Sequence, residues 1–207
     1  MTPRASQQTS DRAAKLSQLQ KQQTRQTRRR SLAWGTAIVA AVALLGGGAT
    51  WAIVASRPPQ VDLSAVKTYV VPHRNHTLAA VTYPQAPPVG GDHNPTLLNC
   101  GIYTRPMPNE NAVHDLEHGA VWITYRPDLP AAQVSDLRNL VRGQTYLTLS
   151  PYPNLPAPVV ASAWGVQLRL SDAGDKRLPA FIAKYKQGPQ TPEPGAPCTG
   201  GIGTPQR

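Results

Sequence analysis

Two cysteines, Cys100 and Cys198, are all that this 207-residue chain contains, and their wide separation excludes several kinds of chemistry. Without a Cys-x-x-Cys pair, the chain lacks the motif of a thioredoxin-like redox centre. It also lacks a Gly-x-Ser-x-Gly run and a glycine-rich phosphate-binding loop that opens a helix. We therefore expect neither serine-hydrolase activity nor a nucleotide or organic cofactor.

Charge is absent from residues 32–56, which consist largely of small and aliphatic residues with Trp34 and Trp51 near the ends. A run of this length can cross a bilayer, which takes about 20 helical residues, and tryptophan favours the membrane interface. We expect a retained transmembrane helix that places the protein in the cell membrane. The alternative is a signal peptide cleaved near Val54-Ala55-Ser56.

Positive charge is concentrated ahead of that segment, where eight Lys or Arg residues accompany a single acid, Asp11. The positive-inside rule makes residues 1–31 a cytoplasmic tail and the remainder extracytoplasmic. No aromatic residue is interleaved with these charges, which favours lipid headgroups over nucleic acid as the partner. We expect a linker at 57–66, an outer domain at 67–187 and a Pro/Gly-rich tail at 188–207, for which a protein or cell-wall partner is conceivable.

The outer domain is predicted to be α+β, with a few helices and a mixed or antiparallel sheet. The patterns indicate strands at 67–71, 78–83, 121–125, 146–149, 159–164 and 166–170, and helices at 131–142 and 178–185. A short helix is expected to open at Asn109 or Asn111 and to close at Gly119. In an oxidising compartment, Cys100 and Cys198 are expected to form a disulfide, the alternative being a metal-ligating cysteine.

All five histidines lie between His73 and His118, and two of them belong to the run His114-x-x-Glu117-His118. Two histidines four apart share one face of a helix, and imidazole is a common ligand of transition metals. This residue pattern matches an inverted zinc-protease motif. The strand-like residues that follow Gly119 argue against a peptidase, because the helix that carries the motif would be short.

Four of the histidines, His76, His93, His114 and His118, are candidate ligands for Zn²⁺ or Cu²⁺. The alternative is a structural role, in which they hydrogen-bond backbone or Glu117 and frame a proline-rich loop. Glu117 is interpreted first as an acceptor that orients a histidine N–H, and otherwise as a ligand or a general base. His73, beside Arg74, is expected to be exposed to solvent.

Three runs carry a family resemblance: Pro87-Pro88-Val89-Gly90-Gly91-Asp92-His93, Cys100-Gly101-Ile102-Tyr103, and Val113 to Val121. In their order and spacing they resemble a bacterial family of membrane-anchored proteins, the domain of unknown function 3105 family, over residues 76–186. The resemblance implies a short cytoplasmic tail, one anchor and an extracytoplasmic domain whose pattern includes His76, His93, His114, Glu117, His118 and Gly119.

Taken together, the patterns predict a single-pass protein of the bacterial cell envelope whose outer domain binds a transition metal. Catalysis is not required by any of them. One alternative is an envelope interaction module without chemistry, in which the histidines are structural. The other is a metal-dependent hydrolase, for which Glu117 is the best catalytic candidate.

Overall fold

The computed structural model describes residues 61–206. The predicted tail at 1–31, the predicted membrane helix at 32–56 and residues 57–60 of the predicted linker lie outside these residues. The described residues belong to one compact unit. Among residues 61–206, no helix combines the length and apolar character needed to cross a bilayer.

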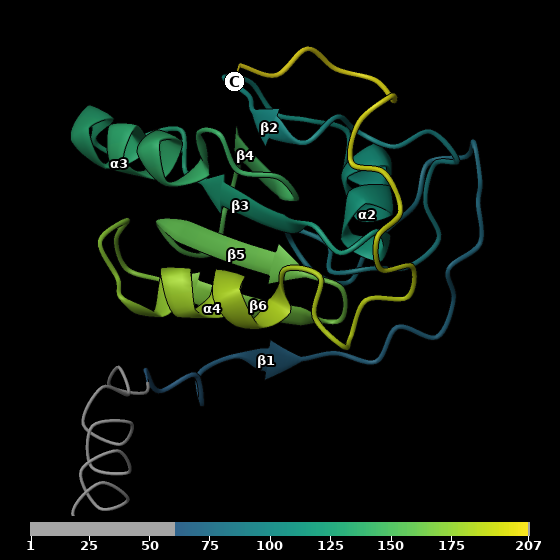
Figure 1. Ribbon diagram of the computed structural model, residues 1–207, viewed down its shortest axis with the longest axis horizontal. Coiled ribbons are helices and arrows are strands. Elements are labelled where there is room, and N and C mark those ends of the chain that lie inside the picture. The colour runs from purple at the N-terminus through teal and green to yellow at the C-terminus, as the bar shows by residue number, and fades with distance from the viewer. Residues whose placement is uncertain (1–60, 207) are drawn as a thin grey trace, which may run out of the picture. The chain divides into compact units, whose positions relative to one another are not determined.

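A mixed six-stranded sheet organises this part of the chain, in the order β1-β6-β5-β3-β4-β2 (Figure 1). The strands are β1 Lys67–Thr68, β2 Gly101–Ile102, β3 Val121–Tyr125, β4 Leu147–Pro151, β5 Val159–Ala163 and β6 Val166–Leu170. β4 runs parallel to β2 and β3, whereas β5 and β6 form an antiparallel hairpin beside β3. The predicted α+β class and mixed sheet are confirmed.

Two helices cover one face of the sheet, α3 Ala131–Val141 and α4 Arg177–Tyr185. Their apolar side chains, among them Leu137 and Phe181, form one core with Val121 and Ile123 of β3. Because side chains alternate across a strand, Trp122 points to the other face and enters a second core with residues of α2 Asn109–Glu117. The sheet thus separates α2 from the other two helices.

The α2–β3 junction follows the local sequence closely. α2 begins at Asn109, as predicted, and Gly119 ends it with a positive φ of 94°. The Gly119 N–H donates to Leu116 O and the Ala120 N–H donates to Asp115 O, which is the paired arrangement of a Schellman cap. β3 then starts at Val121, so the histidines of α2 are attached directly to the centre of the sheet.

The predicted strand at 78–83 is wrong, and the one predicted at 67–71 is shorter than expected. Near residue 78 the only described pairing is an isolated bridge between His76 and His93. Leu78 is 84% exposed and has no sheet to pack against, so the β-forming residues of this segment pair with no neighbouring strand.

The C-terminal residues lie against the domain and follow α2 toward β2 (Figure 1). Isolated bridges join Leu98 to Ile202 and Ile102 to Gln206, and the Cys100 N–H donates to Cys198 O. The predicted disulfide between Cys100 and Cys198 is confirmed and closes a sequence separation of 98 residues.

Candidate metal centre

Four of the five histidines gather at one place beside α2. His114 and His118 come from that helix, and His76 and His93 come from two loop segments that pair through the isolated bridge. One ring nitrogen of each of His76, His93 and His114 lies within 4.8 Å of the chosen nitrogens of the other two. His118 joins them, since its Nε2 lies 3.0 Å from His114 Nε2. His73 is exposed, as predicted.

The three buried rings share one feature, a Nδ1 atom that faces a backbone carbonyl. His93 Nδ1 lies 2.8 Å from Gly91 O, His114 Nδ1 lies 2.7 Å from Asn94 O, and His118 Nδ1 lies 2.6 Å from Pro197 O. A carbonyl oxygen can only accept a hydrogen bond, so each Nδ1 carries the proton and donates it. In a neutral imidazole this leaves the lone pair on Nε2.

The Nε2 atoms of His93, His114 and His118 therefore carry unprotonated lone pairs, and His118 lies beside His114, outside the close group that His114 forms with His76 and His93. Two of them, on His114 and His118, stand only 3.0 Å apart, where lone pairs repel unless a cation lies between them. His93 Nε2 is fully buried and makes no hydrogen bond with any described residue. Such a buried acceptor is costly to leave unpaired. The arrangement calls for a bound cation, either a proton or a metal ion.

Glu117 adds a carboxylate on the Nε2 side of the cluster. Its Oε2 lies 3.0 Å from His93 Nε2 and 4.0 Å from His76 Nε2, and its side chain is 3% exposed. The backbone carbonyls occupy the opposite side, at Nδ1. The sequence predicts Glu117 as the acceptor that orients a histidine, but the main chain supplies the acceptors of the buried imidazoles, and Glu117 faces the atoms that would coordinate.

His76 and Arg74 form the open side of the centre. Their side chains are 52% and 56% exposed, whereas those of Glu117 and His93 are almost fully buried. The His76 ring stacks on His114 at 5.1 Å between centroids, and Arg74 Nη1 lies 3.4 Å from Glu117 Oε1. Solvent therefore reaches the cluster past these two side chains.

Backbone from residues 94–98 runs along α2 and satisfies its buried polar side chains. Asn94 O accepts from His114, Thr96 O accepts from Asn111, and the Leu98 N–H donates to Asp115 Oδ1. The fit explains how a helix with so many polar residues is buried from Asn111 to Glu117.

Burial also shifts the acid–base behaviour of two neighbouring residues of α2. Loss of hydration lowers the pKa of His114, and the adjacent imidazoles lower it further, against the opposing effect of the hydrogen bond to Asn94. Burial raises the pKa of Asp115 well above its ordinary range, although the Leu98 N–H acts in the opposite direction. At neutral pH these effects favour an uncharged His114, the form that binds metals.

Several contributors to this centre carry no signal that marks them in the sequence. Pro197 contributes only a carbonyl oxygen, and Gln187 donates from its amide to His118 O. Glu193 Oε2 lies 3.7 Å from His118 Nε2. Glu193 and Pro197 lie within the predicted tail at 188–207, and Gln187 directly precedes it. All three are 69 to 79 residues from His118 along the chain.

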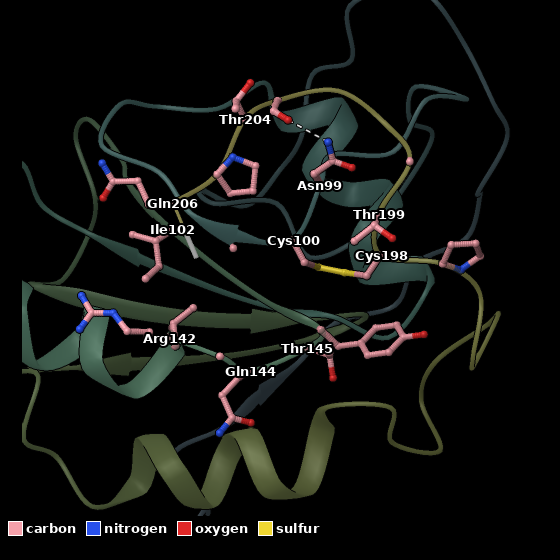
Figure 2. A pocket seen from close by; sticks show the side chains of 18 residues that line it. Asn99, Cys100, Ile102, Arg142, Gln144, Thr145, Cys198, Thr199, Thr204 and Gln206 are labelled. Carbon is pink, nitrogen blue, oxygen red and sulfur yellow. Dashed lines mark hydrogen bonds between the residues drawn. A yellow bond between two sulfur atoms is a disulfide. The ribbon is translucent and has the colours of Figure 1, made fainter.

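A cavity of about 770 Å³ lies beside the disulfide (Figure 2). It is lined by Cys100 and Cys198, by the end of α3 and by the C-terminal residues up to Gln206. Cys100, Asp115 and Cys198 also place two sulfurs and a carboxylate oxygen close together. The disulfide joins the two sulfurs to each other, so the His cluster is the better candidate for a metal.

Comparison with protein families assigns this chain to one family. The family described as "Protein of unknown function (DUF3105)" matches residues 73–200, more than half of the sequence. The chain belongs to that family, and the matched range contains every side chain of the His cluster as well as both cysteines. No curated protein and no solved structure matches the chain.

Proposed function

We propose that this protein is a single-pass protein of the bacterial cell envelope whose outer domain binds Zn²⁺ or Cu²⁺. Residues 32–56 would anchor it in the membrane, with the basic N-terminus in the cytoplasm and the His cluster outside. The ligands in this proposal are His76, His93, His114 and His118, of which the first three form the close group and the fourth lies beside His114. Glu117 lies beside His93.

One observation carries the metal assignment: ring nitrogens of His76, His93 and His114 lie within 4.8 Å of one another, and backbone carbonyls hold the Nδ1 protons of the two buried rings, which leaves their Nε2 atoms free to bind. Metal-bound histidines are oriented in this way, through a hydrogen bond from the nitrogen that does not coordinate. Neighbouring nitrogens in a tetrahedral zinc shell stand about 3.4 Å apart, as follows from Zn–N bonds of about 2.1 Å. The 3.0 Å between His114 and His118 is close to that spacing.

The structural alternative puts protons where we propose a metal. One proton would be shared between His114 and His118, and a second would make His93 an imidazolium beside Glu117. Both arrangements bury charge that water would otherwise solvate, and burial already lowers the pKa of His114. A divalent ion serves all these acceptors at once, which is why we favour the metal.

Glu117 fits the role of an anionic ligand better than that of a general base. A base must leave room for a water molecule between itself and the metal. The Glu117 carboxylate instead lies 3.0 Å from a nitrogen that would coordinate. Binding is therefore the proposed activity, and hydrolysis is the second possibility that the experiments below distinguish.

The test uses the full chain, purified without a polyhistidine tag, and measures bound metal by inductively coupled plasma mass spectrometry. We expect about one Zn²⁺ or Cu²⁺ per chain in the wild-type protein. His114→Ala and His118→Ala should each abolish stoichiometric binding, because each opens the coordination shell. His73→Ala is the matched control, an exposed histidine of the same region, and should bind like the wild type.

Metal that remains stoichiometric after both α2 histidines are replaced would contradict this site. In that case the structural alternative predicts that the same changes lower the free energy of unfolding equally with and without added metal. Under our proposal, Zn²⁺ raises the melting temperature of the wild-type protein and not that of the double variant, because ligands stabilise only the state that binds them.

A further inference from the structure

The segment from Gln187 to Cys198 forms a wall of the His cluster. The Glu193 N–H donates to Glu117 O over 3.0 Å, and the Glu193 carboxylate approaches His118 Nε2 at 3.7 Å. Four residues later, Pro197 O accepts the proton of His118 Nδ1. The same histidine is therefore contacted at both ring nitrogens by one stretch of chain that lies 75 or more residues away in sequence.

Few elements hold this wall in place. No helix or strand spans residues 187–198. The Gln187 side chain links His118 to Gly195, since its Nε2 donates to His118 O and its Oε1 accepts from the Gly195 N–H. Tyr146 Oη donates to Ala196 O. The covalent attachment is the disulfide at Cys198, next to Pro197, and the Cys100 N–H donates to Cys198 O.

We infer that the disulfide-held segment Glu193–Cys198 is part of the metal site: Glu193 supplies a further carboxylate ligand, Pro197 positions His118, and metal affinity depends on the intact Cys100–Cys198 bond. The inference rests on the proposed metal-binding function and extends it to a redox dependence. Without the bond, Pro197 O is free to leave His118, and the imidazole loses both its tautomer preference and its orientation.

The bond is placed where a reductant can reach it. Both cysteines line the cavity of about 770 Å³, whose lining contains none of the histidines (Figure 2). A dithiol would deliver two electrons and two protons, giving the Cys100 and Cys198 thiols, and would itself become a cyclic disulfide. Metal release on reduction would follow from the loosened wall, with no change at the histidines.

The experiment compares Zn²⁺ affinity in the wild-type full chain and in a Cys100→Ser, Cys198→Ser double variant, by competition with a chromophoric chelator. Serine variants avoid dithiol reductants, which bind zinc themselves. We expect the double variant to bind one Zn²⁺ about 10- to 100-fold more weakly, the usual effect of removing an orienting partner. Wild-type affinity in a folded double variant, as judged by circular dichroism, would overturn the inference.

A second pair of variants tests the segment with the disulfide intact. Gln187→Asn shortens the bridge between His118 and Gly195 and tolerates the positive φ of 54° at this position. Gln187→Asn should also weaken Zn²⁺ binding, and it tests the role of the wall even if the cysteine variant does not fold. Unchanged affinity in a folded Gln187→Asn protein would refute that role.

Glu193→Gln should weaken binding by up to about 10-fold as an exposed ligand is lost, whereas the exposed Asp128→Asn should have no effect. Equal affinity for these two variants would remove Glu193 from the site. A wild-type chain that binds no Zn²⁺ or Cu²⁺ at all is a different result, because it refutes the proposed function itself.

Discussion

Replacing Gly119 with alanine should damage both the stability of the domain and its metal centre. Gly119 closes α2 with a φ of +94°, a conformation in which a side chain is strained by about 1–3 kcal/mol. An added Cβ would also collide with the Gln187 amide and would lie 2.9 Å from Thr191 Cγ2. Gln187 would have to move and to give up its hydrogen bond to His118 O.

The expected magnitude follows from these two effects. A hydrogen bond of this kind contributes about 1 kcal/mol. Together with the backbone strain, we expect the free energy of unfolding to fall by about 2–4 kcal/mol. Urea denaturation followed by circular dichroism measures that loss. Zn²⁺ affinity should fall as well, because Gln187 holds the wall that contains Pro197.

Gly143→Ala is the matched control. Gly143 follows α3 with a φ of +71°, and a Cβ built there meets nothing within 4 Å. It should therefore show only the backbone strain, about 1 kcal/mol, and unchanged metal affinity. If Gly119→Ala is no more destabilising than Gly143→Ala, the steric argument for Gln187 and for the wall is incorrect.

Four further predictions follow. The metal-free protein should lose stability as the pH falls from about 6.5 through the lowered pKa of His114, because the unfolded chain takes up the proton first. Urea midpoints measured across this pH range report the loss, and His114→Gln should reduce it. The raised pKa of Asp115 makes the wild-type protein lose stability as the pH rises above about 4. In thermal melting at pH 7, Asp115→Asn should therefore be at least as stable as the wild type. Glu117→Gln should weaken Zn²⁺ binding about 10- to 100-fold, whereas a general base would leave binding intact and abolish a hydrolytic activity. Protease added to intact spheroplasts should digest the domain after Arg57 and spare the tail before Arg30; protection of the domain would contradict the proposed orientation.

The sequence by itself determined the elements whose signals are local. α2 could be predicted because Asn109 opens it and Gly119, which tolerates a positive φ, closes it. β3 could be predicted because β-branched and aromatic residues are concentrated at 121–125. The spacing of His114 and His118 placed both on one face of that helix, and the cysteine count led directly to the disulfide.

Only the tertiary structure decided which chain segments surround those histidines. The carbonyls of Gly91, Asn94 and Pro197 fix the three imidazoles, yet every residue has a carbonyl and nothing in the sequence marks these three. The predicted strand at 78–83 failed for the same reason, because β-forming residues make a strand only where a partner strand and a core exist. Glu193 and Gln187 reach the centre through the course of the C-terminal segment, which the fold and the disulfide set together. Local sequence patterns therefore predicted the candidate ligands, whereas long-range packing set the orientation of their imidazole rings.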